Sequence, residues 1–209
     1  YVHRSHSGYF GIVNSEEGFQ NLTRFLFGNV RVDGELTISS IRLPEDLDKI
    51  AKKGDRDVRA SYHFECIARV RGVHWDLTRR VAQENSAIFR TFSELFPNIK
   101  VDKDEKQIAR PHHDNPELFT AYLMTDDNYK ADKTREGLGF TVDLGVLVPD
   151  YSIDGIAFLR DHFPGGYIFR DKINLEALPD PTGGTNWKLR YGYDSETSNQ
   201  VKYDAPIKK

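Results

Sequence analysis

The chain has 209 residues, of which 38% are apolar and 29% are charged, and its formal net charge at pH 7 is -3. These values predict a folded core in one large or two small domains. They argue against a nucleic-acid-binding protein, which needs a clustered basic face, and no run of about 18 apolar residues is present to form a transmembrane helix.

The residue counts also bear on compartment and fold class. Cys66 is the only cysteine, so no intrachain disulfide can form, and we expect a reducing compartment, the cytoplasm. We expect no signal peptide in the sequence as given, and its start at Tyr1 instead of Met predicts a piece cleaved or excised from a longer protein. The 13 Phe and 10 Tyr residues are typical of β-sheet proteins.

An amphipathic helix over residues 15–27 is the first predicted element. Asn14 or Ser15 can cap its start, and Asn14 with Glu17 has the spacing of a capping box. Its apolar residues fall on one face: Phe19, Leu22, Phe25 and Leu26. Gly28 follows at the position where a residue in the left-handed conformation commonly ends a helix.

Beyond the helix, the apolar spacing changes to the alternation that is typical of strands. Residues 34–43 alternate with a change of phase at Ser39 and Ser40, which indicates a bulge. The charged segment 45–57 is predicted to be a solvated loop.

The clearest strand spans residues 60–70. Its alternation places Cys66 on the apolar face as a small buried residue. Gly72 is predicted to turn the chain into a partner strand over residues 73–77. Residues 82–97 fit either a short helix or a strand with a loop.

The second half of the chain predicts strands separated by polar segments. The strands are expected at 118–124, 138–148, 167–175 and 187–193. Residues 98–115 are predicted to be a surface loop, residues 149–166 a short connection, and the segment from Ser195 a polar tail. No alternation of strands with helices is present, so we predict a mainly β fold: an antiparallel β-sandwich over residues 30–209 with one N-terminal amphipathic helix.

Histidine pairs and acidic clusters are the candidate metal ligands. His3 and His6 lie close in sequence, but no further ligand at a zinc-site spacing lies near them. The adjacent histidines within residues 111–114 point apart in extended chain. The acidic segments 101–105 and 125–128 can form a calcium site only where loops converge to supply its oxygens. Solvated loops explain these segments more simply, so no metal and no cofactor is predicted.

No complete active site can be assembled from this sequence alone. It contains no G-x-S-x-G nucleophile elbow, no phosphate-binding loop and no H-E-x-x-H motif. The middle of an apolar strand face is a poor place for a reactive thiolate, which argues against Cys66 as a nucleophile.

The segment HSGYFGIVNSEEGFQNLTRFLFGNVRV does resemble a known arrangement. A histidine and a serine are followed by a short loop, a capped amphipathic helix and an exit into a β domain. It is similar to the end of bacterial lipase- or esterase-like α/β-hydrolases, in which the last strand leads to the loop of the catalytic histidine and a helix packs on the sheet. The resemblance covers roughly the first thirty residues, and the strands near the C-terminus resemble the β-sandwich tails of such proteins more weakly.

This resemblance implies that residues 1–29 are the C-terminal end of an α/β-hydrolase domain and residues 30–209 an appended β-sandwich. His6 would be the general base, and the nucleophilic serine and the acid would come from an upstream domain or chain, because the triad order in this fold is Ser, acid, His. The piece would be an accessory portion that is inactive alone. Lipid or protein partners, but no nucleic acid, are expected.

Two other interpretations remain open from the sequence. The chain can be a non-catalytic β-sandwich binding or adaptor module, with the helix buried on a sheet and exposed aromatic residues as the contact surface. It can also be a structural subunit of an assembly whose partners cover the aromatic strands.

Overall fold

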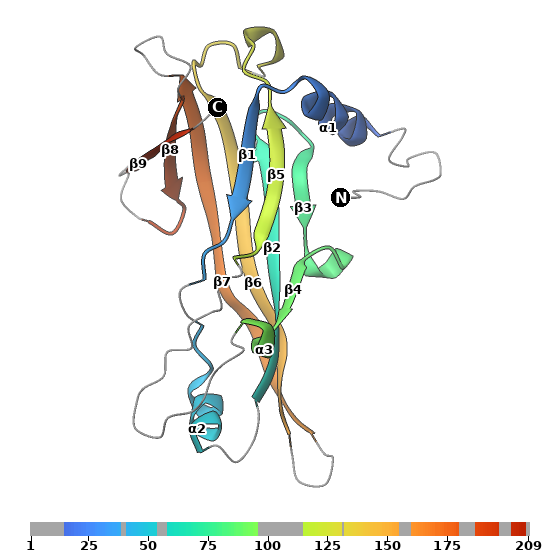
Figure 1. The fold of residues 1–209 in the computed structure, drawn as a ribbon, viewed down its shortest axis with the longest axis vertical. Helices are drawn as coiled ribbons and strands as arrows, with labels where there is room; N and C mark the ends of the chain where they lie inside the picture. The colour runs from blue at the N-terminus through green and yellow to red at the C-terminus, as the bar shows by residue number, and fades with distance from the viewer. Residues whose placement is uncertain are drawn as a thin grey trace.

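The computed structural model describes residues 15–38, 41–53, 58–95, 115–130, 132–154, 160–179, 187–196 and 202–207. Two antiparallel sheets make up most of this part of the chain (Figure 1). The larger has seven strands in the order β3-β2-β6-β7-β8-β9, with β4 also paired to β2. Its strands are β2 (Val58–Val70), β3 (Asp76–Arg80), β4 (Ile88–Thr91), β6 (Leu138–Asp154), β7 (Arg160–Pro179), β8 (Trp187–Tyr193) and β9 (Lys202–Ile207).

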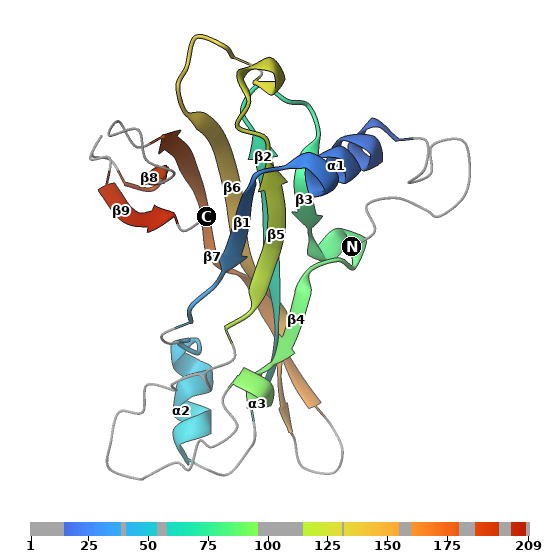
Figure 2. The same ribbon diagram turned by 45° about the horizontal axis from the view of Figure 1, so that its top comes forward.

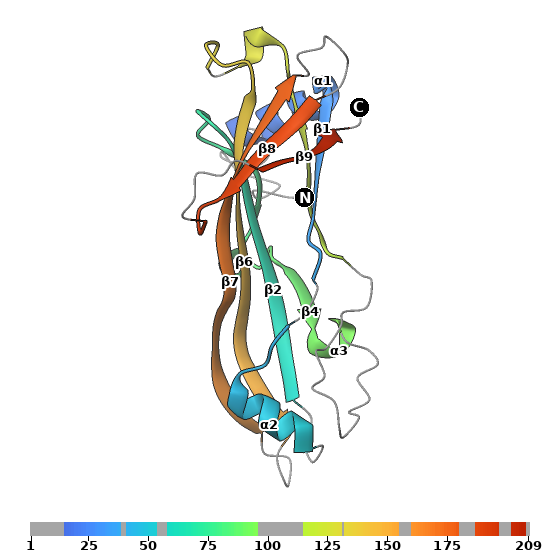
Figure 3. The same cartoon turned by 90° about the vertical axis from the view of Figure 1, so that its left-hand side faces the viewer.

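The smaller sheet pairs β1 (Val30–Glu35) with β5 (Glu117–Leu123) and lies over one face of the larger sheet (Figure 3). Helices α2 (Glu45–Lys53) and α3 (Phe92–Leu95) lie toward the other end of the same face. Together they enclose one apolar cluster in which the side chains of β2 alternate inward. The larger of its fully buried members are Tyr62, Phe64, Cys66, Leu47, Leu95, Val148 and Ile153.

The structure confirms the coarse prediction of a mainly β chain with antiparallel strands and an N-terminal amphipathic helix. Strand β2 matches the predicted strand 60–70, and Cys66 points into the core with no exposed surface. Gly72 takes a positive φ of 79°, as a turn glycine does. The ambiguous segment 82–97 contains a short 3-10 helix at Ala82–Glu84, then β4 and α3, up to residue 95.

Two segments predicted as loops contain regular structure. Residues 45–53 form helix α2, because its apolar positions fall on one side and Leu47 is almost fully buried in the core. The predicted polar tail contains strand β9, which pairs with β8. The alternation over residues 34–43 was wrong as a strand prediction, since β1 ends at Glu35 and the described residues beyond it have no strand partner.

The largest correction concerns residues 149–166. Instead of a short connection, β6 continues to Asp154 and β7 begins at Arg160. The two strands form one long hairpin, paired from Leu138 opposite Ala177 at one end to Asp154 opposite Arg160 at the other. Pro149 lies in an irregularity where three residues of β6 oppose two of β2. A bulge tolerates proline because its N–H is not needed in the ladder.

Candidate functional site at helix α1

Helix α1 (Glu16–Phe27) begins at a side-chain cap. Ser15 is extended, and its Oγ accepts a hydrogen bond from the backbone N–H of Gly18 at 3.0 Å. The Gln20 side chain donates to Glu16 Oε1 one turn away at 2.7 Å. The predicted helix is therefore confirmed with Ser15 as its cap, whereas Asn14 lies outside the described residues.

The apolar face of α1 points away from the protein. Its exposed fractions are 60% for Phe19, 56% for Leu22, 60% for Phe25, 59% for Leu26 and 70% for Phe27. We call these five residues the outer face of α1. An amphipathic surface helix ordinarily buries its apolar stripe in the core of its own domain, and α1 does the reverse.

The polar side of α1 contacts the sheets, and Phe25 at the border of the outer face does so as well. Asn21 Nδ2 donates to the Asp76 carbonyl of β3 at 3.4 Å, and the Arg24 guanidinium lies 5.5 Å from the Trp75 ring centre. The Phe25 ring also touches Tyr122 of β5 edge-on, with 5.4 Å between the ring centres. Figure 2 shows α1 beside β5 and β3 at this end of the molecule.

The junction between α1 and β1 fixes the orientation of the helix. Asn29 N–H donates to the Leu123 carbonyl, and the Asn29 side chain both donates to Thr125 Oγ1 and accepts from Thr125 N–H, at 2.7 and 3.0 Å. Gly28 is extended (φ -66°), which corrects the predicted left-handed ending. A glycine is needed there because a Cβ would collide with the Arg24 carbonyl and with the Tyr122 Cβ.

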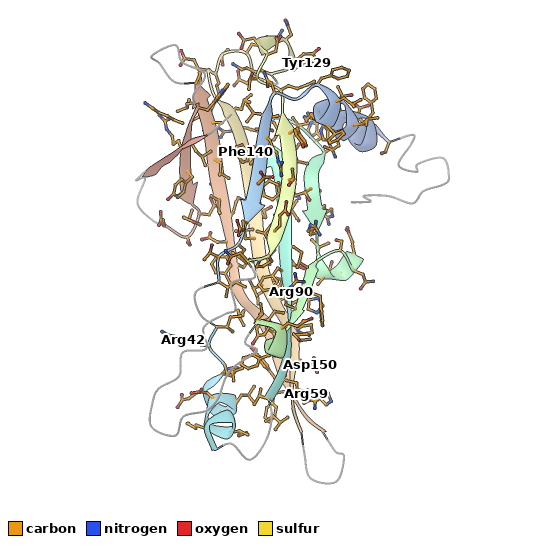
Figure 4. All side chains as sticks on the ribbon, in the orientation of Figure 1. Arg42, Arg59, Arg90, Tyr129, Phe140 and Asp150 are labelled. Atoms are coloured by element: carbon orange, nitrogen blue, oxygen red, sulfur yellow. The ribbon has the colours of Figure 1, made fainter. Side chains whose placement is uncertain are left out.

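Behind α1 lies a pocket of about 100 Å³. Gln20 and Arg24 of α1 line one side, Arg71 of the turn after β2 lines another, and the connection from β5 to β6 supplies Lys130, Asp132 and Arg135. The remaining lining is mostly apolar: Val70, Val73, Leu123, Met124, Leu138 and Phe140. Figure 4 labels Tyr129 and Phe140, which also belong to this lining.

The cations of this pocket differ in how they are neutralised. Lys130 Nζ is bound by Asp127 at 2.6 Å and donates to the Glu136 carbonyl at 3.0 Å, and Arg135 Nε lies 3.3 Å from Asp132. Arg24 Nη1 is shielded from solvent and has no hydrogen-bond partner within the described ranges, and burial lowers the pKa of this guanidinium. Arg24 is therefore held in the protein without a counter-ion from the described residues.

The candidate ligands and catalytic groups of the sequence do not meet at a site. His3, His6 and the segments 101–105 and 111–114 lie outside the described residues. In the acidic segment 125–128, Asp126 caps a short 3-10 helix by accepting from Asn128 N–H. Over the described ranges no three His, Cys, Asp or Glu side chains gather as a metal site would require, and no helix there is long and apolar enough to cross a membrane.

Sequence reasoning missed both the outward direction of α1 and the pocket behind it that Arg24 and Arg71 line. The apolar stripe was visible, but a stripe alone predicts burial in the domain core. The helical spacing does place Arg24 on the side opposite to Phe19 and Leu26, and this was the only indication in the sequence that Arg24 lies away from the apolar stripe. Comparison with known proteins gives no relative to extend this description: no family model, no curated protein and no solved structure matches the chain.

Proposed function

We propose that this chain is a β module, inactive on its own, that docks onto a neighbouring protein domain through the outer face of α1. The observation that carries the proposal is the reversed helix, with five large apolar side chains exposed by more than half. An exposed apolar patch of this kind marks an interaction site. The clamped α1–β1 junction holds the patch in one orientation, so little ordering entropy opposes docking.

The size of the outer face favours a partner domain over a second copy. Each of its three Phe side chains leaves about 120 Å² exposed, from a total of about 200 Å² for an aromatic side chain. With the two Leu residues, the face offers roughly 500–600 Å², less than the ~800 Å² per partner of a standard interface. A groove in another domain, by contrast, can enclose the helix from several sides and so bury more area than a symmetric contact between two α1 helices.

Charge argues against a lipid surface as the partner. Helices that lie in membrane interfaces carry Lys and Arg on their polar face. The described polar side of α1 has one cation, Arg24, which is turned inward onto Trp75, and the chain is negatively charged overall. The outer face is therefore matched to an uncharged protein groove.

The resemblance of the first thirty residues provides a candidate for the partner domain. In this form of the proposal α1 is the last helix of a lipase- or esterase-like α/β-hydrolase, its outer face packs on that domain, and the two antiparallel sheets are a β-sandwich accessory. His6 would act as general base for a serine supplied by that domain. The outer face supports docking, and the resemblance alone supports the hydrolase. The alternative of a self-contained binding module requires α1 to be buried, which the exposed face argues against.

Hydroxyl-radical footprinting tests the docking. The 209-residue chain and the natural polypeptide purified from its own cells are oxidised side by side, and Phe19, Phe25 and Phe27 are read by mass spectrometry. We expect rapid oxidation in the isolated chain and, in the natural protein, a rate as low as that of the buried Phe119, which is 6% exposed. Tyr129, exposed by 66% and outside α1, is the control and keeps its rate.

A natural protein in which the outer face is oxidised as fast as Tyr129 would overturn the docking. If the outer face is protected, the mass of the natural polypeptide, or of its complex, identifies the partner domain. A serine-directed fluorophosphonate probe tests the hydrolase separately. Protection of the outer face without labelling of a serine rejects the hydrolase and keeps the docking. Labelling of a serine supports both when the natural protein also hydrolyses an ester and its His6→Ala variant does not.

A further inference from the structure

We infer that strand β7 binds an extended segment of a partner protein, with alternating apolar and acidic residues, as an added β-strand. The site is the edge of β7 from His162 to Arg170, which we call the free edge. It lies on the large sheet away from helix α1, so the proposed docking of α1 is not needed for it (Figure 1). An unpaired strand edge, exposed apolar side chains and the charge of Arg170 support the inference.

The pairing of β7 is complete on one side only. On that side β7 pairs with β6 over residues 160–177. On its other side β8 pairs with it only over residues 173–179, and the Asp194 N–H closes this pairing by donating to the Lys172 carbonyl at 2.9 Å. Within the described residues no strand lies against the second side of the free edge. Backbone N–H and C=O groups on an open edge are complementary to one kind of partner, another extended strand.

The free edge is blunted only in part. Natural sheets usually protect their edges with proline, bulges or charge. Here Pro164 lacks an N–H, and Ile168 is the extra residue of a bulge, since Tyr167 and Phe169 lie opposite consecutive residues of β6. Even so, the exposed fractions are 46% for Tyr167, 44% for Ile168 and 43% for Phe169. A run of exposed apolar residues on an unpaired edge favours the addition of a strand.

The free edge is apolar on the side of the large sheet that the small sheet covers. Phe163 lies opposite the buried Tyr151 and packs against the apolar cluster, and Phe169 lies opposite the buried Val146. Side chains alternate between the two sides of a strand, so every second residue of an added strand would lie on this side. Apolar residues at those positions would cover Phe169 and extend the cluster by one strand.

The opposite side of the free edge carries the charge of Arg170. This residue lies opposite Gly145, and its guanidinium carbon lies 5.0 Å from the centre of the Tyr167 ring. The Tyr167 hydroxyl in turn donates to Glu65 at 2.8 Å. Within the described part of the chain Arg170 has no carboxylate partner. An acidic residue across from it on the added strand would supply one, and such cross-strand pairs of opposite charge are stabilising.

A second copy of this chain fits the free edge less well than an unlike strand. No Asp or Glu occurs between His162 and Arg170. Two free edges paired with each other would therefore leave both copies of Arg170 without a carboxylate. A strand that alternates apolar and acidic residues matches both sides of the edge at once, because its two sets of side chains point to opposite sides of the sheet.

Fluorescence anisotropy on the 209-residue chain tests the inference with a labelled peptide of alternating valine and glutamate, about eight residues long to match the free edge. We expect saturable binding with a Kd below about 1 mM. The same peptide methylated at every backbone nitrogen cannot donate to the edge, and a valine–lysine peptide repels Arg170. Each should bind at least about tenfold more weakly. Amide hydrogen exchange should slow at residues 165–170 when the glutamate peptide is bound.

Variants locate the binding on the free edge. Phe169→Ser should weaken binding of the glutamate peptide about tenfold through lost apolar contact. Phe89→Ser is the matched control, because Phe89 is an aromatic residue of β4 with a similar exposed fraction of 49%, and it should bind like the wild type. Arg170→Glu should reverse the preference between the glutamate and lysine peptides. Should Phe169→Ser not fold, as judged by circular dichroism, Arg170→Glu decides.

Four results would overturn the inference. These are the absence of saturable binding, equal weakening by Phe89→Ser, equal binding of the glutamate and lysine peptides, and slowed exchange confined to another strand. A dimer in sedimentation that dissociates in Phe169→Ser would show that a second copy occupies the free edge and would replace the partner strand. Leu22→Ser on the outer face of α1 should leave peptide binding unchanged, which keeps this result separate from the docking.

Discussion

Cys66 lies in the middle of β2 with no exposed surface, and its surroundings determine its chemistry. Desolvation penalises the thiolate and raises the pKa of the Cys66 thiol to about 12 from an ordinary value of 9.0. A buried thiol that stays protonated is a poor nucleophile, and within the described residues no group of metal-ligating side chains gathers around it. The residue therefore acts as a small apolar core residue, as its place in the alternating pattern predicted.

This raised pKa gives a prediction at the residue scale. Above pH 9 the unfolded chain releases the thiol proton while the folded chain keeps it, so the free energy of unfolding falls by about 1.4 kcal/mol per pH unit from this group, up to the folded pKa. The stability is fully present below pH 9. Cys66→Ala should remove this part of the slope in urea unfolding under reducing conditions between pH 8 and about pH 10.5. Parallel pH dependences for wild type and variant would contradict the assignment.

Helix α1 shows at the element scale that a stable helix need not belong to the core beneath it. No residue of α1 is a member of the buried cluster, and its contacts with the sheets include the Asn21 hydrogen bond, the Arg24–Trp75 contact and the Phe25–Tyr122 edge contact. These contacts lie outside the buried apolar cluster, and together they hold the helix without adding much to the stability of the sheets.

Deleting residues 1–27 should therefore leave the β module folded. We expect the free energy of unfolding to fall by only about 1 kcal/mol, because surface contacts of this kind contribute little each. Phe119→Ala, which removes a buried ring of β5, is the contrasting variant and should cost about 3–5 kcal/mol. Denaturant unfolding followed by circular dichroism measures both. A truncated chain without a cooperative transition would show that α1 is part of the core.

The elements that the sequence missed were hidden for two different reasons. Helix α2 was hidden because its charges dominate the composition, although Leu47 is buried in the core and Ile50 packs against it. The β6–β7 hairpin was hidden because Pro149 and Pro164 suggested a connection. In the fold, Pro149 is accommodated by an irregular register against β2, and Pro164 lies opposite Asp150 in the hairpin.

At the scale of the whole molecule, the second face of the large sheet carries a network of ion pairs across neighbouring strands. Arg69 of β2 binds Asp76 of β3 at 2.6 Å and Asp143 of β6 at 2.9 Å, and Lys172 of β7 lies 3.8 Å from Asp143. The large sheet is thus apolar on the side that the small sheet covers and charged on the other side, which is the distribution expected of a sheet with one solvated face.

Asp143→Asn tests this network. Arg69 and Lys172 are more than one third exposed, so solvent screens the pairs, and we expect a loss of only about 0.5–1 kcal/mol in the free energy of unfolding at low salt. The loss should shrink in about 1 M salt, where the screening length is roughly 3 Å. Glu45→Gln, which breaks the highly exposed pair with Lys49, is the control with little expected effect. A loss that is independent of salt would indicate packing instead of charge.

The sequence by itself determined the local properties of this protein: the cap and length of α1, the inward alternation of β2, the burial of Cys66 and the mainly β class. These follow from spacings of two to four residues, which each segment carries without its neighbours. Only the tertiary structure decided which side of each element is covered. The apolar stripe of α1 is the same whether it faces the sheets or the solvent. Arg24, Arg71 and Lys130 come from α1, from the turn after β2 and from the connection between β5 and β6, and these distant segments meet only when the two sheets pack together.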